Sequence, residues 1–148
     1  MKRVMIIGGS GSGKSTLARM LGVITSLPVI HIDPMYWKPG WVQRSAKETA
    51  QMIHEIVQAD HWIFEGNHSR AFPDRVARAD MLVFLDMPTW LRLLRVIGRT
   101  ITGYGRTRRE MPEGCPERFD LDFLKWVADY NRRGRDTAFQ TLAKAPEN

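Results

Sequence analysis

The sequence predicts an α/β fold with a mostly parallel sheet, and two patterns in the chain indicate it. Four short apolar runs, at residues 3–7, 28–32, 62–65 and 81–85, have the composition of buried strands. Helical patterns separate these runs, and such alternation is typical of parallel strands joined by right-handed crossovers. The 148 residues are enough for one sizeable core, so we expect a single domain over residues 1–148.

The composition is that of a soluble globular chain, with 43% hydrophobic and 26% charged residues. No apolar run approaches the roughly 20 residues of a membrane-spanning helix, so we expect no membrane partner. Cys115 is the single cysteine, which excludes an internal disulfide and a cysteine zinc cage. These features predict a cytoplasmic protein.

The first strand and the first helix flank the stretch GGSGSGKST at residues 8–16. Apolar residues at positions 17, 18, 20 and 21 recur at helical spacing after it. A helix is therefore predicted to begin in the glycine-rich stretch and to end near Gly22. Further along, Ser45 and Glu48 have the spacing of a capping box and predict a second helix over residues 45–59.

The glycine-rich stretch matches GxxxxGK[ST], the pattern of a phosphate-binding loop, between a predicted strand and a predicted helix. Glycines let successive backbone N–H groups curl around a phosphate, and the helix dipole adds positive potential there. Lys14 is expected to reach the β- and γ-phosphates of a nucleotide, and the Ser15 hydroxyl to ligate Mg²⁺. The residues predicted to bind the nucleotide are Gly8, Gly9, Ser10, Gly11, Ser12, Gly13, Lys14, Ser15 and Thr16.

A run of arginines with no acidic residue among them lies between positions 92 and 109, in a chain of formal net charge +6. Arginine suits bidentate contacts to phosphate oxygens. The run therefore predicts a bound polyanion, either a nucleoside triphosphate or a nucleic acid, and the alternative is a solvated basic face. The six arginines are Arg92, Arg95, Arg99, Arg106, Arg108 and Arg109.

Several segments resemble the adenylate kinase and shikimate kinase group of small P-loop kinases. The segment ADMLVFLDMPTWLRLLRVIGR is similar to the adenylate kinase stretch in which a strand ends in Asp-x-Pro and a helix closes with Arg-x-x-Gly-Arg. In combination, HIDPMYWKPGW, WIFEGNH, RVIGR and GCPERF resemble the P-loop kinase-like proteins often labelled DNA topology modulation proteins.

The resemblance covers residues 1 to about 135 and implies a three-layer P-loop NTPase fold. It also implies a mobile, arginine-rich lid over about residues 100–118. Relatives usually continue into a fifth strand, whereas four strands are visible here. Either the chain was trimmed or the sheet has only four strands.

The resemblance further implies a kinase that uses ATP and Mg²⁺ to phosphorylate a nucleotide, a nucleoside or another small hydroxyl acceptor. The sequence contains neither the guanine-binding NKxD motif of GTPases nor the paired acids that often end an ATPase strand. The alternative is a nucleic-acid-associated, ATP-binding regulator that affects DNA topology. No helix-turn-helix, RNA-binding sheet motif or zinc finger supports this alternative.

On the acceptor side, the resemblance places Asp33 where small kinases keep an acid that accepts or orients a hydroxyl proton. An ordinary helix cap is the other interpretation. His31 lies two residues earlier on the same strand face, where it would touch the substrate or pack in the core. Tyr36, Trp37 and Trp41 would stack on a base or sugar, or pack the substrate flap onto the core.

Glu65 takes the place of the Asp in the adenylate kinase Asp-Gly pair, so the resemblance implies a position beside Mg²⁺ and its waters. Asn67 and Arg70 follow Glu65 and are expected to enter the substrate cleft. Arg70 resembles the arginine that binds an acceptor phosphate in these kinases, displaced by about one position.

The lid arginines complete the predicted site. Arg95 and Arg99 are four residues apart and share a helix face, so both are expected to contact phosphates. Residues 100–116 have too few apolar side chains to form their own core, which is typical of a mobile lid. Arg118 resembles a lid arginine that returns to the nucleotide. The predicted catalytic residues are thus Lys14, Asp33, Arg95, Arg99 and Arg118.

Overall fold

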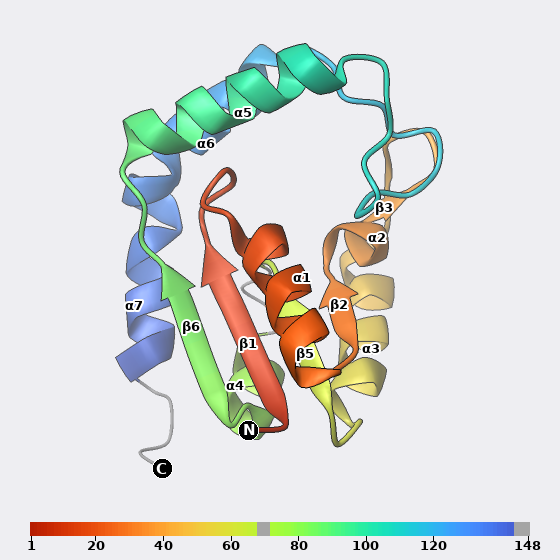
Figure 1. Cartoon of the computed structure of the whole chain (residues 1–148), viewed down its shortest axis with the longest axis vertical. Coiled ribbons are helices and arrows are strands. Elements are labelled where there is room, and N and C mark those ends of the chain that lie inside the picture. The colour runs from red at the N-terminus through yellow and green to blue at the C-terminus, as the bar shows by residue number, and fades with distance from the viewer. Residues whose placement is uncertain (68–71, 144–148) are drawn as a thin grey trace.

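The computed structural model describes residues 1–67 and 72–143 and has the expected alternation of strands and helices (Figure 1). The first half of the chain forms β1 (Arg3–Gly8), α1 (Lys14–Thr25), β2 (Val29–His31), α2 (Asp33–Tyr36), β3 (Trp37–Lys38), β4 (Val42–Gln43) and α3 (Ala46–Val57). The second half forms β5 (Trp62–Glu65), α4 (Phe72–Arg78), β6 (Met81–Leu85), α5 (Thr89–Gly103), α6 (Leu121–Arg133) and α7 (Arg135–Ala143).

The main sheet has four parallel strands in the order β2-β5-β1-β6, which confirms the predicted α/β fold. β1 is central and pairs with both β5 and β6, so that Met5 lies opposite Phe64 on one side and Leu82 on the other. β3 and β4 form a separate antiparallel hairpin between α2 and α3. Parallel strands bring their carboxyl ends to one edge, where α/β proteins bind their ligands.

Helices cover both faces of the sheet. Side chains alternate along β1, so its apolar residues point to both faces and both must be buried. Val4 and Ile6 are fully buried in one cluster with Ala18 of α1. Met5 and Ile7 are fully buried in the other cluster, which also contains side chains of α3, α4 and α7. The result is the expected three-layer arrangement, with α1 on one face and α3, α4 and α7 on the other (Figure 1).

The first helix is longer than predicted, since α1 continues to Thr25 rather than ending near Gly22. A Cβ atom at Gly22 would lie 2.4 Å from Cγ2 of Val29. The glycine therefore lets α1 approach β2 closely, and the helix ends where Ser26 takes a left-handed conformation with φ of 58°. The second predicted helix is confirmed, because Ser45 and Glu48 form the reciprocal capping box at the start of α3.

α5 and α6 cross the carboxyl end of the sheet, and the segment between them reaches over toward β3 (Figure 1). α5 extends to Gly103, so the irregular part of the lid begins later than the predicted residue 100. Met111 and Cys115 of this segment are buried. Within the described ranges, no helix is long and apolar enough to cross a membrane.

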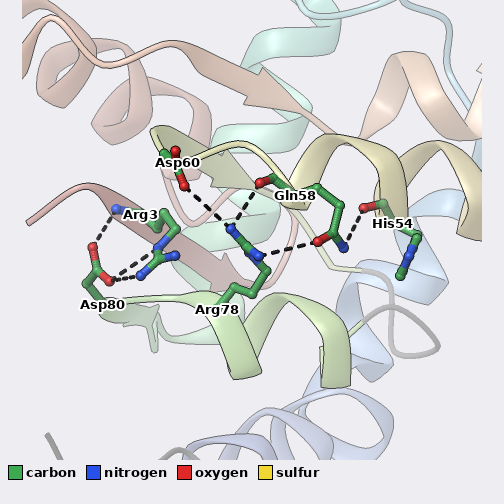
Figure 2. A network of polar contacts seen from close by, with 6 residues as sticks. All are labelled: Arg3, His54, Gln58, Asp60, Arg78 and Asp80. Atoms are coloured by element: carbon green, nitrogen blue, oxygen red, sulfur yellow. Dashed lines mark hydrogen bonds and ion pairs between the residues drawn. The ribbon is translucent and has the colours of Figure 1, made fainter.

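A polar network ties together the amino ends of the strands, at the edge opposite the lid (Figure 2). The Asp80 carboxylate accepts hydrogen bonds from the backbone N–H groups of Lys2 and Arg3 at 2.8 and 2.9 Å. It also accepts from the Arg3 guanidinium at 2.7 Å. Nearby, Arg78 donates to the backbone carbonyl of Gln58 at 2.9 Å. The Asp80 bonds join the start of β1 to the turn that precedes β6, and the Arg78 bond joins the end of α4 to the turn that precedes β5.

We expect Asp80→Asn to lower the urea midpoint of unfolding at neutral pH. The side-chain hydrogen bond from Arg3 and the two backbone N–H donors hold the pKa of Asp80 well below its usual range. Its contribution to stability is therefore present above about pH 4, the ordinary range of an aspartate, and is lost as the pH falls toward the native pKa. The difference between the two proteins should narrow on acidification.

The matched control is Asp60→Asn, because Asp60 is exposed and lies 3.8 Å from Arg78. Its midpoint should stay close to that of the wild type at every pH. Equal midpoints for Asp80→Asn and the wild type at neutral pH would contradict the proposed role of Asp80.

Candidate functional site

The loop between β1 and α1 can be built only with glycine at a key position. Gly11 has φ of 81°, and a Cβ atom there would lie 2.5 Å from the carbonyl oxygen of Arg92. Any other residue would clash with the backbone of α5 and strain its own. The Ser12 N–H donates to the Gly9 carbonyl at 3.1 Å, which closes the turn just before α1 begins.

Two polar side chains from distant parts of the chain hold this loop in place. Asn67, which follows β5, donates to the Gly8 carbonyl at 2.7 Å and accepts from the Gly8 N–H at 3.1 Å. Asn67 was predicted as a substrate residue, and this geometry shows it supporting the phosphate-binding loop. Arg92 lies directly against Gly9, because a Cβ atom added at Gly9 would be only 2.5 Å from the Arg92 guanidinium.

Arg92 corrects part of the prediction for the arginine run, because its side chain is buried and engaged by the protein itself. Its guanidinium donates to the carbonyls of Met87 and Val127 at 3.1 and 3.0 Å. It also donates to the side chains of Thr89 and Asn131, both at 3.0 Å. Arg92 is therefore a structural anchor between α5 and α6 and is not a ligand of a polyanion.

The charged residues of the loop begin α1. Lys14 donates from Nζ to the Gly9 carbonyl at 3.1 Å, so its amine points back over the loop. Burial lowers the pKa of Lys14, and the nearby carboxylates of Glu65 and Asp33 oppose this effect. The Ser15 hydroxyl donates to Oε1 of Glu65 at 3.0 Å. The loop and the end of β5 thus meet at a hydroxyl and a carboxylate.

Glu65 is almost fully buried and is also paired with His31 of β2. The two side chains approach to 2.7 Å between Nδ1 and Oε1. Burial opposes ionisation of Glu65, but the hydrogen bond from His31 and the charge of Lys14 outweigh it and lower the carboxyl pKa. His31 was predicted either to contact substrate or to pack in the core, and in the structure its side chain pairs with Glu65.

Asp33 opens α2 directly after β2 and faces the same cleft as Lys14 and Glu65. Burial raises the pKa of Asp33, and the like charge of Glu65 raises it further. Arg108, Lys14 and Arg99 favour the ionised form but do not restore the ordinary value. Asp33 is thus a carboxyl group with increased proton affinity beside the phosphate-binding loop.

The aromatic residues of the predicted flap pack against one another and against the lid. The rings of Tyr36 and Trp37 meet edge to face at 5.0 Å, and those of Trp37 and Trp41 at 5.3 Å. Trp41 donates from its backbone N–H to Sγ of Cys115 at 3.3 Å and from Nε1 to the Pro116 carbonyl at 3.2 Å. The hairpin and the lid therefore enclose one side of the site together.

A single cleft of about 980 Å³ brings most of the predicted residues together. Its lining includes Ser10, Gly11, Gly13, Lys14, Ser15, Thr16, Asp33, Tyr36, Trp37, Trp41, Glu65, Asn67, Arg95, Arg99 and Arg118. Four other predicted residues do not line it, and their contacts place Gly8, Gly9 and Ser12 in the loop and His31 against Glu65. Arg70 lies outside the described residues.

The lid arginines reach the cleft in different ways. Arg95 is exposed, and its guanidinium lies 3.5 Å from the Ser12 carbonyl. Arg99 and Arg108 both pair with the buried carboxylate of Glu117. Arg118 lies over the ring of Trp41, 5.4 Å from its centroid. The cleft is thus bordered by arginines, and Arg99 and Arg108 are already paired with a carboxylate.

The lining residues that were not predicted include Arg19, Glu110 and Glu117. Arg19 of α1 pairs with Glu110 of the lid, and Glu117 holds Arg99 and Arg108. The sequence signal for Glu117 was its position beside Arg118 in GCPERF. Arg19 and Glu110 are separated by most of the chain, so local patterns gave no signal for their contact.

No family model matches this sequence. The curated sequences that match include the ATP-dependent protease ATPase subunit HslU of Helicobacter pylori, strains Shi470 and G27. Each is 27% identical over 79 residues. The match covers 53% of this chain but spans only 17% of the HslU length.

Solved structures show a closer likeness in fold. The shikimate kinase of Aquifex aeolicus superposes with a TM-score of 0.53 at 18% identity, over 88% of this chain and 80% of the other. That of Bacteroides thetaiotaomicron gives 0.57 at 16%, over 93% and 82%. A gluconokinase from Sinorhizobium meliloti gives 0.51 at 15%, over 94% and 97%.

These likenesses show a P-loop NTPase fold of the shikimate kinase type. The finer resemblance to DNA topology modulation proteins stays a prediction.

We expect Gly11→Ala to abolish nucleotide binding and to lower the free energy of unfolding by about 1–3 kcal/mol. The added methyl would meet the backbone of α5 at a left-handed position. Urea denaturation measures the stability loss, and calorimetric titration with ATP and Mg²⁺ measures binding.

Gly98→Ala provides the control, since Gly98 lies inside α5 and nothing is within 4 Å of its added Cβ. This substitution should raise stability by about 0.5–1 kcal/mol and leave binding unchanged. Retained binding in Gly11→Ala would contradict the assignment of the loop.

Proposed function

We propose that this chain is an ATP-dependent phosphotransferase that moves the γ-phosphate of ATP to a small hydroxyl acceptor such as a nucleoside, a nucleotide or a similar compound. One observation carries the proposal: Lys14 of the phosphate-binding loop and the carboxyl group of Asp33 line the same cleft. They lie close enough to affect each other's pKa. Such a transfer requires a group that binds the phosphates of the donor and a group that accepts the hydroxyl proton, and Lys14 and Asp33 would supply them.

The loop has the features that bind a triphosphate. Its backbone curls at the start of α1, where unpaired N–H groups and the helix dipole favour anions. Lys14 supplies a positive charge at the loop, and its amine donates to a carbonyl of the loop itself.

Ser15 and Glu65 fit a site for Mg²⁺. Their hydroxyl and carboxylate oxygens are 3.0 Å apart, and oxygen donors are what this ion prefers. Mg²⁺ in protein sites is usually held by one or two carboxylates together with substrate phosphates. A bound Mg²⁺ ion would neutralise negative charge on the β- and γ-phosphate oxygens. His31 would keep the Glu65 carboxylate oriented toward this position.

Asp33 would take the proton of the acceptor hydroxyl. A general base works best when its pKa approaches the operating pH, and burial shifts Asp33 in that direction. Arg95, Arg99 and Arg118 would surround the transferred group with positive charge, which stabilises the charge of a phosphoryl-transfer transition state.

The direct test is to incubate the protein with ATP, Mg²⁺ and a panel of nucleosides, nucleotides and small alcohols, and to measure ADP release. We expect at least one acceptor to raise ADP release above the level without acceptor. Lys14→Ala should stay folded and show no measurable transfer, because the loop keeps its glycines and loses the charge on the phosphates. Unchanged turnover in this variant would refute the kinase assignment.

A second substitution separates binding from chemistry. Asp33→Asn keeps the size of the side chain but removes its proton affinity, so ATP should still bind while transfer falls about a hundredfold. In the wild type, kcat/KM should decrease as the pH falls through the raised pKa of Asp33, because the protonated carboxyl cannot accept a proton. Rates close to wild type in Asp33→Asn would show that Asp33 acts only as the start of α2.

A further inference from the structure

One lid carboxylate lies between two arginines of the cleft. Oε1 of Glu117 is 3.3 Å from Nε of Arg99 and 2.5 Å from Nε of Arg108. Its second oxygen lies 3.4 Å from the hydroxyl of Thr100, which donates to it. The Glu117 side chain is only 8% exposed, although it lines the cleft together with both arginines.

The backbone holds Glu117 in this position from both sides of the lid. Its N–H donates to the Arg106 carbonyl at 2.9 Å, and its own carbonyl accepts from the Gly105 N–H at 2.9 Å. A β-bridge also joins Tyr104 to Glu117. Glu117 thus lies where the outgoing and returning parts of the lid are hydrogen-bonded to each other. Because its backbone is held there, the carboxylate can leave the arginines only if the side chain rotates or the lid moves.

The positive charges of Arg99 and Arg108 lie close together, and a negative partner between them offsets their repulsion. Burial lowers the pKa of Arg99, and the like charge of Arg108 lowers it further, whereas Glu117 favours the charged form. Arg99 also lies close enough to affect the pKa of both Lys14 and Asp33. The pair of guanidinium groups therefore lies near the centre of the proposed transfer site.

A carboxylate and a phosphate present similar oxygen pairs to arginine. We propose that Glu117 is a placeholder for a phosphate group of the substrate: its carboxylate occupies the two-arginine position that a phosphate takes when substrate binds. This inference rests on the proposed function. It implies that a polyphosphate must displace Glu117, so that the exchange lowers the affinity of the site while keeping both arginines charged, paired and aimed into the cleft.

Calorimetric titration of Glu117→Gln tests the inference with two probes, ATP with Mg²⁺ and inorganic tripolyphosphate. Loss of the competing negative charge should lower both dissociation constants about tenfold. The control is Glu113→Gln, the same change at an exposed glutamate of the same lid, which should leave both constants unchanged. A purely structural role for Glu117 predicts the opposite sign, because a disordered lid would bind both anions more weakly.

Equal or weaker binding by Glu117→Gln would overturn the inference, and so would a wild type that binds neither anion. If the wild type binds both anions and Glu117→Gln binds them more tightly, but no acceptor yields ADP, the proposed transfer fails and the placeholder role stands. If Glu117→Gln does not fold, Glu117→Asp keeps the charge with a shorter reach. Its dissociation constants should then fall by a smaller factor, and unchanged constants would contradict the inference.

Discussion

The site depends on the hydrogen bonds of one buried side chain, the guanidinium group of Arg92. It joins the segment after β6 to α5 and α6 through four hydrogen bonds, and it lies 4.9 Å from the centroid of the Tyr130 ring. A buried charge is costly unless its donors are satisfied. Because these bonds satisfy the guanidinium, Arg92 fixes both helices across the end of the sheet and supports the loop at Gly9.

Charges of opposite sign alternate from the phosphate-binding loop to the lid. Lys14 lies near Glu65 and Asp33, Asp33 is influenced by Arg108 and Arg99, and those two arginines share one lid carboxylate. Each charge therefore has an opposite charge nearby, which offsets the cost of keeping ionised groups in a partly buried cleft. A polyphosphate bound in the cleft would add negative charge beside these two arginines, which is where we propose that it replaces Glu117.

The sequence predicted the parts of the structure that depend on local patterns. The phosphate-binding loop, the four parallel strands and the capping box at Ser45 each follow from residues within a few positions of one another. The predicted end of α1 was wrong. Gly22 lets α1 pack closely against β2, and its neighbours in sequence do not reveal this contact. The hydrogen bonds of Asn67 to Gly8 and the burial of Arg92 were not predicted for the same reason, because the partners are 59 and 35 residues away.

The contacts of Trp41 join the two sides of the cleft. Trp41 belongs to the β3–β4 hairpin, yet it donates to Cys115 and Pro116 of the lid. In turn, the Cys115 thiol lies 3.5 Å from the Lys38 carbonyl of the same hairpin. The lid cannot lift away without breaking these bonds, so in this arrangement the hairpin and the lid open together. The hairpin and the lid are consequently held over the cleft by one set of contacts.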